Sequence, residues 1–186
     1  MKQQRPLIAV YGSSTTRPGQ RAYDMSLALG RHLGELGADV MTGGYSGVME
    51  ACSRGAREAG AQAVGVTVEL FEGRGPVNPW VSERVHTPDL FARLQHIVAR
   101  ADGFVVAPGS IGTLTELYLT WTLVSVNGRA RAPIVLLGGR WPAVLEAHRG
   151  EDAVAEALYE YVACTGDPLD AARRVMAAVG APGARA

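Results

Sequence analysis

Three glycine-containing turns carry the residues of this chain that are best suited to chemistry. They are residues 12–15, 43–47 and 108–116, and each lies between a short apolar run and a segment with helical spacing. At the end of a parallel strand, such a turn presents backbone N–H groups and a helix N-terminus to an anion, and glycine allows close approach. A single turn of this kind is equally consistent with a ligand site and with a tight strand–helix connection that binds nothing. Three such turns in one sheet favour a nucleotide-like ligand. The best phosphate cradle is Pro108-Gly109-Ser110-Ile111-Gly112-Thr113.

Two charged residues accompany that cradle. Glu116 lies one turn into the following helix, where the helix N-terminus favours an ionised carboxylate facing the ligand. A solvent-facing glutamate is the alternative, but the surrounding helix is too apolar to offer much solvent-exposed surface. Arg93 lies on the polar side of the helix before the same strand, and taken alone it would be a surface arginine.

The basic residues exclude several cofactor chemistries. Of 18 basic residues, Lys2 is the only lysine, and it lies in a polar N-terminal segment. A Walker-type phosphate loop needs a lysine on the phosphates, and a pyridoxal enzyme needs a buried lysine for its Schiff base. The dinucleotide fingerprint GxGxxG is absent, because no glycine follows Gly12 before Gly19. We therefore expect no cofactor, and phosphate held by backbone amides and arginine.

Composition and charge indicate a small-molecule ligand. The formal net charge is zero and no block of like charge is present, which argues against nucleic acid or an anionic membrane as partner. Cys52 and Cys164 do not make a disulfide framework, and no stretch has the length of a signal or membrane segment, so we expect a cytoplasmic protein. The histidines show no metal-ligand spacing, so no metal site is expected: His32, His86, His96 and His148.

Apolar periodicity predicts strands that alternate with helices. Strands are expected over residues 7–11, 39–42, 63–68, 103–107, 133–137 and 162–164. Helices are expected over residues 22–36, 48–59, from Pro88 to about 100, 113–126, 141–148 and 168–179. The stretch from Glu69 to Thr87 has no period and is broken by prolines, so it is interpreted as a long functional loop.

This alternation predicts a single α/β domain over residues 1–186. Continuous apolar strands point to a Rossmann-like, doubly wound parallel sheet with helices on both faces, with flexible ends at 1–5 and 180–186. The ligand of such a sheet lies beyond the strand carboxyl ends, at the switch point. The helix over residues 113–126 is apolar nearly all round and must be covered on more than one side.

Two of the turns carry a family resemblance. Thr42-Gly43-Gly44-Tyr45-Ser46-Gly47-Val48-Met49-Glu50 and Pro108-Gly109-Ser110-Ile111-Gly112-Thr113-Leu114-Thr115-Glu116 resemble the GGGxxGxM and PGGxGTxxE signatures of the Lonely Guy (LOG) family. The likeness extends from about Leu7 to Leu137. Members are cytokinin-activating phosphoribohydrolases, long labelled lysine decarboxylases, that cleave nucleoside 5′-monophosphates to free base and ribose 5-phosphate. The lack of a usable lysine agrees with the newer description.

The resemblance implies roles for particular residues. The family's catalytic glutamate falls on Glu116, and its catalytic arginine falls on Arg93. A family threonine near the substrate falls on Thr122, although Thr120 shares a helix face with Glu116 and is the alternative. The resemblance also implies a homodimer, formed through the helix over 113–126. The expected residues for nucleoside monophosphate and phosphate binding are Gly12, Ser13, Ser14, Gly43, Gly44, Gly47, Met49, Pro108, Gly109, Ser110, Ile111, Gly112, Thr113 and Thr122.

Four positions depart from the family pattern. Ser110 replaces the second glycine of PGG, Thr115 replaces a glutamate, and Leu94 replaces the lysine that usually follows the arginine. Gly75 stands where plant members have a substrate-binding glutamate. Because these are recognition positions, AMP-like and cytokinin nucleotides both stay open as substrates. A non-catalytic nucleotide or molybdenum-cofactor carrier of the same fold is the alternative.

Overall fold

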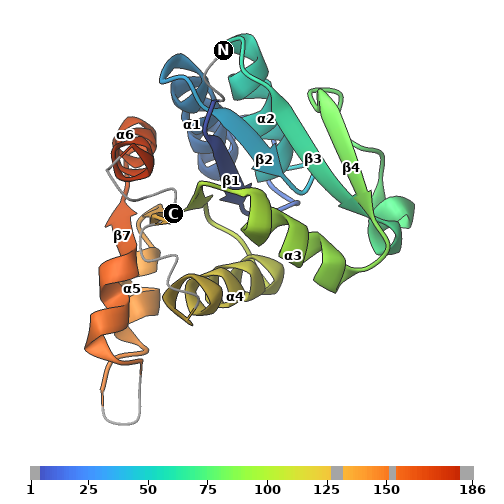
Figure 1. The fold of residues 1–186 in the computed structure, drawn as a ribbon. Helices are drawn as coiled ribbons and strands as arrows, with labels where there is room; N and C mark the ends of the chain where they lie inside the picture. Colours follow the sequence, from blue (N-terminus) through green and yellow to red (C-terminus); the bar gives the residue numbers. More distant parts are fainter. Residues whose placement is uncertain (1–4, 127–131, 151–153, 181–186) are drawn as a thin grey trace.

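A parallel sheet forms the centre of the protein (Figure 1). The computed structural model describes residues 5–126, 132–150 and 154–180. Within them the sheet has seven strands in the order β4-β3-β2-β1-β5-β6-β7, each parallel to its neighbours. The strands are β1 (Leu7–Tyr11), β2 (Asp39–Thr42), β3 (Ala63–Val68), β4 (Glu83–Thr87), β5 (Gly103–Val106), β6 (Ile134–Leu137) and β7 (Val162–Thr165).

Helices cover both faces of the sheet (Figure 1). One face carries α1 (Arg21–Glu35), α2 (Val48–Glu58) and α6 (Pro168–Val179), and the other carries α3 (Leu90–Arg100), α4 (Ile111–Val126) and α5 (Trp141–Glu146). Side chains of β1 alternate between these layers, since Ile8 and Val10 pack under α1 and α2 while Ala9 and Tyr11 pack under α3 and α4. The expected doubly wound α/β fold is therefore confirmed.

The switch point of the sheet lies between β1 and β5. From β1 the chain proceeds through β2 and β3 to β4 on one side, and β5, β6 and β7 then extend the sheet on the other. The turns at this point are bonded to one another, because Ser13 N–H donates to the Pro108 carbonyl at 3.0 Å. Val48 N–H, at the start of α2, donates to the Ser13 carbonyl at 2.8 Å. The three glycine-containing turns thus meet at the carboxyl ends of neighbouring strands, where ligands of such sheets bind.

The stretch from Glu69 to Thr87 contains regular structure that the sequence did not indicate. The 3-10 helix η1 (Glu69–Arg74) follows β3, and β4 then pairs with β3 along its whole length. The interpretation of this stretch as one loop was therefore wrong. β4 is an edge strand whose side chains are mostly exposed, so it needs no apolar alternation and its backbone pairing leaves no hydrophobic signature.

Helix boundaries agree with the sequence expectations to within two residues. The helix expected to begin at Pro88 begins at Leu90, because Asp89 caps it by accepting a hydrogen bond from Ala92 N–H at 2.8 Å. At the chain ends, Arg5 lies 3.2 Å from the Asp39 carboxylate, whereas residues 1–4 and 181–186 lie outside the described residues. No helix in the described part of the chain has the length and apolarity needed to cross a membrane.

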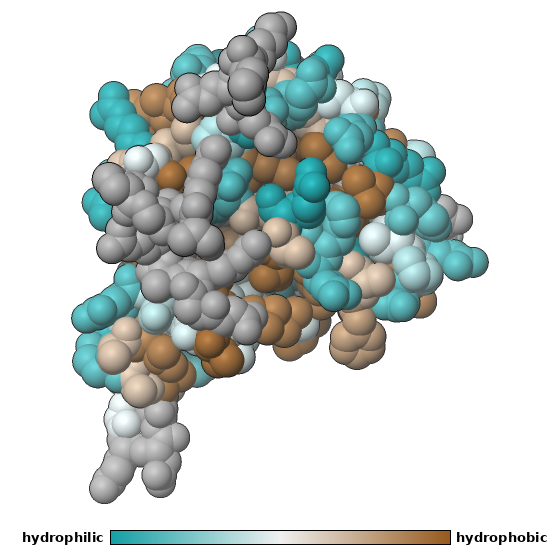
Figure 2. Space-filling view, viewed as in Figure 1, coloured by the Kyte–Doolittle hydropathy of each residue, from teal (hydrophilic) through white to brown (hydrophobic). Residues whose placement is uncertain are grey.

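Helix α4 buries only part of its apolar surface in this chain. Leu117, Trp121 and Val124 face the sheet and are buried. Ile111 at its start and Val126 at its end are 78% and 75% exposed. Figure 2 shows apolar surface gathered over the region of this helix. A second side of α4 packs against the 3-10 helix η2 (Glu156–Tyr161), where Trp121 Nε1 donates to the Leu158 carbonyl at 2.8 Å. The helix is therefore covered on more than one side, as expected, while its two ends stay exposed.

Candidate functional site

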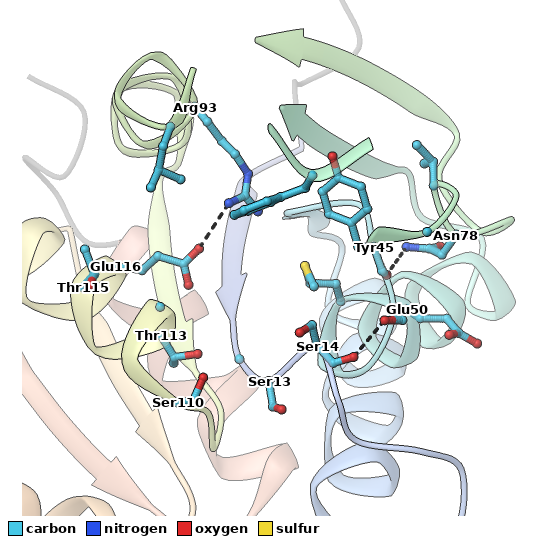
Figure 3. A pocket seen from close by; sticks show the side chains of 18 of the residues that line it. Ser13, Ser14, Tyr45, Glu50, Asn78, Arg93, Ser110, Thr113, Thr115 and Glu116 are labelled. Carbon is cyan, nitrogen blue, oxygen red and sulfur yellow. Dashed lines mark hydrogen bonds and ion pairs between the residues drawn. The ribbon is translucent and has the colours of Figure 1, made fainter. Parts of the chain in front are cut away.

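A cavity of about 620 Å³ opens at the switch point (Figure 3). This volume lies within the range of small-molecule sites. Its walls come from five segments: the turn after β1, the turn into α2, the segment from η1 to residue 79, helix α3, and the start of α4. The sheet contributes strand ends, while the helices contribute side chains and N-termini.

Most of the residues expected to bind ligand lie on the cavity wall, and one lies well away from it. Lining residues among them are Gly12, Ser13, Ser14, Met49, Arg93, Ser110, Ile111, Gly112, Thr113 and Glu116. The remaining expected turn residues belong to the same three turns but are not part of the lining: Gly43, Gly44, Gly47, Pro108 and Gly109. Thr122 is exposed on α4 and does not line the cavity.

Arg93 is buried, although the sequence alone would make it a surface residue. Its side chain enters the cavity wall from α3, and its Nε donates to the Val66 carbonyl at 2.8 Å. The guanidinium lies 5.6 Å from the centre of the Phe71 ring, which adds a cation–π contact. Gly43 explains the close approach of this guanidinium, because a Cβ atom there would collide with Arg93 and with the Met49 sulfur.

Glu116 faces Arg93 across the cavity wall. Its Oε1 lies 3.9 Å from a terminal nitrogen of Arg93, so the two form a loose ion pair (Figure 3). Burial raises the pKa of the Glu116 carboxyl to about 7, against the opposing effect of the Arg93 charge. The carboxyl group is therefore able to exchange a proton near neutral pH, as an acid–base or electrostatic catalyst requires.

A buried hydroxyl pair lies one turn along α4 from Glu116. The Tyr11 hydroxyl and Thr120 Oγ1 are 3.0 Å apart, and both residues are buried. Burial, followed by the nearby Glu116 charge, raises the Tyr11 pKa, so the phenol stays neutral. Thr120, the alternative to Thr122 as a substrate contact, thus directs its hydroxyl to Tyr11, and neither threonine lines the cavity.

The start of α4 has the properties of an anion site. Leu114 N–H donates to the Ser110 carbonyl at 3.1 Å, so the preceding amides of the first turn have no partner inside the helix. The first turn carries no acidic residue, while Ser110 and Thr113 place hydroxyls beside the cavity. Gly109 is required by packing, because a Cβ there would collide with the Thr113 side chain.

The sequence analysis missed one wall of the cavity. Lining residues that were not expected to bind ligand include Tyr45, Glu50, Phe71, Asn78 and Leu90. Asn78 holds this wall in place, because its backbone N–H donates to the Gly44 carbonyl at 2.9 Å and its Nδ2 donates to the Tyr45 carbonyl at 3.0 Å. The position of Glu50 could have been recognised from the sequence, since it directly follows Met49 in a signature motif. The stretch from Glu69 to Thr87 has no apolar periodicity, so its lining residues could not be found in this way.

The departures from the family pattern also lie at this cavity. Leu94, Ser110, Thr115 and Gly75 all line it. Leu94 is buried and makes the wall beside Arg93 apolar, where the family pattern has a lysine. Among the described residues no three histidine, cysteine or acidic side chains gather as a metal site would require.

Curated relatives resemble parts of this chain at low identity. The pyrimidine/purine nucleotide 5′-monophosphate nucleosidase of Escherichia coli K12 is 29% identical over 141 residues, which cover 71% of this chain and 31% of that protein. The cytokinin riboside 5′-monophosphate phosphoribohydrolase of Mycobacterium tuberculosis is 35% identical over 83 residues, covering 45% of this chain and 44% of that protein. The chain thus spans less than half the length of either relative.

Solved structures share the fold over nearly the whole chain. The molybdenum cofactor binding protein of Rippkaea orientalis has a TM-score of 0.74 at 21% identity, covering 95% of this chain and 98% of its own. The molybdenum cofactor carrier protein of Chlamydomonas reinhardtii has a TM-score of 0.72 at 24% identity, covering 96% of this chain and 100% of its own. At these identities the likeness supports the fold alone.

A family model gives the broader assignment. The model described as "Possible lysine decarboxylase" matches residues 49–175, which include Met49, the end of the first signature, and the whole of the second. Curated proteins named as phosphoribohydrolases and nucleosidases also match this chain. The chain therefore belongs to this lysine-decarboxylase-like family, the LOG family.

Proposed function

We propose that this protein is a nucleoside 5′-monophosphate N-ribohydrolase. It cleaves the N-glycosidic bond of AMP-like or cytokinin nucleotides and releases the free base and ribose 5-phosphate. The observation that carries the proposal is the buried Arg93–Glu116 pair on the wall of a nucleotide-sized cavity, next to an anion-binding helix start. Relatives named as nucleotide nucleosidases and phosphoribohydrolases support the same reaction class.

In this proposal the 5′-phosphate binds at the start of α4. The unpaired amides of residues 111–113 and the hydroxyls of Ser110 and Thr113 hold its oxygens. Ser13 and Ser14 extend this polar surface across the cavity floor (Figure 3). Because Glu116 follows one turn along the same helix, a phosphate held at the helix start brings the ribose beside its carboxylate.

The proposed reaction is hydrolysis through an oxocarbenium-like transition state. Water adds its oxygen to the anomeric carbon as the bond to the base breaks; one water proton goes to the departing base nitrogen, and the other stays on the new anomeric hydroxyl of ribose 5-phosphate. The Glu116 carboxylate stabilises the positive charge that develops on the ribose and orients the water. Arg93, fixed by Val66 and Phe71, lies close enough to Glu116 to hold its carboxylate in place and to assist the leaving base.

Base release from purified protein tests the proposal. We expect free base from at least one member of a panel that includes AMP, isopentenyl-AMP, GMP, CMP and UMP, followed by chromatography. The Glu116→Gln variant should lose about 10²- to 10³-fold in kcat, because it keeps the shape but loses the charge. No free base from any nucleotide would contradict the enzyme assignment, and a large fall in melting temperature of the variant would show that Glu116 is structural.

A second function, that of a non-catalytic carrier, is compatible with the structural neighbours. Two solved proteins named as a molybdenum cofactor binding protein and a molybdenum cofactor carrier match nearly the whole of this chain and of their own. A carrier would bind a phosphate-containing ligand in the same cavity without turnover. Tight binding of a nucleotide or a pterin phosphate, together with no product from any substrate, would favour this function over hydrolysis.

The proposed assembly is a homodimer formed through α4. The exposed apolar ends of this helix, Ile111 and Val126, and the 85% exposed Phe91 on α3 support a second copy on this face. α3 and α4 both cover the same face of the sheet (Figure 1).

A further inference from the structure

The cavity has a second carboxylate, Glu50, on the side opposite to Glu116. Its lining includes three charged side chains, Glu50, Arg93 and Glu116, and the latter two form a pair. Glu50 projects from the first turn of α2 and lies across the cavity from the start of α4 (Figure 3). The site therefore contains one acid with a nearby cation and one that needs another partner.

A buried tyrosine fixes this second carboxylate. The hydroxyl of Tyr23, on α1, donates to Glu50 Oε1 at 3.2 Å, and the tyrosine ring is almost fully buried. Burial raises the pKa of Tyr23, and the adjacent Glu50 charge raises it further, so the phenol remains a donor. Since Tyr23 occupies one oxygen, Oε2 of Glu50 is left to accept a hydrogen bond from the cavity.

No arginine in the described part of the chain neutralises Glu50 through an ion pair. Arg54 lies one turn further along α2, but its Nε donates to Glu58 at 2.8 Å and its guanidinium lies 5.6 Å from the centre of the Trp80 ring. The half-buried Glu50 lines the cavity without an ion-pair partner among the described side chains.

The charges give the cavity a polarity. The start of α4 has free amides, two hydroxyls and no acid in its first turn, whereas the start of α2 carries Glu50. A phosphate is attracted to the former and repelled by the latter. A nucleotide is thus oriented with its phosphate toward Ser110 and Thr113 and with a neutral, hydrogen-bond-donating group toward Glu50.

We propose that Glu50 is a specificity-determining residue, whose free carboxylate oxygen accepts a hydrogen bond from a donor on the sugar or base of the bound nucleotide. This inference rests on the proposed nucleotide-binding function. The donor is a ribose hydroxyl or an exocyclic amino group, which present the same chemistry to a carboxylate. A ligand that lacks the donor leaves a half-buried charge unpaired and should bind more weakly.

Calorimetric titration of a Glu116→Gln parent tests the inference, because the parent binds nucleotide without consuming it. Adding Glu50→Ala to this parent should raise the Kd for AMP roughly tenfold to a hundredfold, and adding Glu50→Gln should raise it less, because the amide keeps an acceptor but loses the charge. Unchanged or tighter binding of AMP by both variants would overturn the inference, as would no binding of any nucleotide to the parent.

Three further ligands identify the donor. IMP lacks the amino group of AMP, 2′-deoxy-AMP lacks the 2′-hydroxyl, and 3′-deoxy-AMP lacks the 3′-hydroxyl. The ligand without the relevant donor should bind more weakly to the parent and should lose no further affinity when Glu50 is replaced. Equal losses for AMP, IMP, 2′-deoxy-AMP and 3′-deoxy-AMP would mean that Glu50 acts on none of these donors and would contradict the proposal.

Matched variants separate recognition from folding. Tyr23→Phe removes the hydroxyl that fixes Glu50, so it should weaken AMP binding in the same direction but by a smaller factor. Glu146→Gln makes the same charge change on α5, outside the cavity lining, and should leave the Kd unchanged. The two proposals fail separately, because base release by the wild-type protein tests hydrolysis whereas these titrations test Glu50 without turnover.

Discussion

Arg93 and Glu116 form a charged pair in a largely buried site, where burial outweighs the neighbouring positive charge in setting the pKa of the glutamate. Both are largely buried, and removal of either would leave the other without its partner. Arg93 is further held by the Val66 carbonyl and the Phe71 ring, whereas Glu116 has only the loose contact with Arg93 as a charged partner among the described residues. The arginine is therefore the fixed member of the pair, and the glutamate is free to engage substrate.

The raised pKa of Glu116 predicts an acidic limb in the rate profile. Because burial raises this pKa to about 7, the carboxylate is depleted as the pH falls below that value. A reaction that needs the carboxylate should lose about tenfold in kcat/KM for each pH unit below 7. Initial rates between pH 5 and 9 measure this limb, and a rate that stays constant down to pH 5 would mean that the charged form of Glu116 is not required.

The raised pKa of Glu116 also predicts that stability falls as the pH rises, which gives an independent check. Between the unfolded pKa near 4.5 and the folded pKa near 7, the folded state binds more protons than the unfolded state, so stability falls as pH rises through this range. The melting temperature of the wild type should therefore decrease from pH 5 to pH 8 relative to that of Glu116→Gln. If the melting temperatures of the two proteins changed equally with pH, this result would contradict a raised pKa of Glu116 in the folded state.

At the scale of elements, the turn between β2 and α2 sets the position of the arginine. Gly43→Ala should displace the Arg93 guanidinium, since the added methyl group collides with it and with Met49. We expect at least about 100-fold loss of base release, because small displacements of a catalytic group carry such costs. Gly166→Ala is the control, since nothing lies within 4 Å of its added Cβ. Full activity of Gly43→Ala would show that this turn does not position Arg93.

The sequence predicted the elements whose signals are local. Turns such as residues 43–47 were found because glycine and the following helical period lie within a few residues of each other. β4 was missed because an exposed edge strand carries no apolar alternation, and with it the sequence missed Phe71 and Asn78 on the adjoining wall. The proximity of Arg93 to Glu116 depends on how α3 and α4 pack, so only the family resemblance suggested it.

At the scale of the whole molecule, the site depends on the switch in strand order. The strands that follow β1 lie on one side of it, and the strands that follow β5 lie on the other side. The turns after β1 and β5 therefore diverge, and the cavity lies between them. α2, α3 and α4 then close its sides, so residues from distant parts of the chain meet there. The same arrangement places α4 both at the cavity and at the surface.

The apolar surface of α4 leads to the last prediction, that the protein is a dimer in solution. A chain of 19.6 kDa should then scatter light as a particle of about 39 kDa. Val126→Asp places a charge on the exposed end of α4 and should produce a monomer, because an unpaired charge buried in an apolar interface is strongly destabilising. Leu36→Asp, at the end of α1, makes a similar change on the opposite face of the sheet and should leave the dimer intact. A monomeric wild type, or a Val126→Asp variant that remains dimeric, would show that α4 does not form the interface.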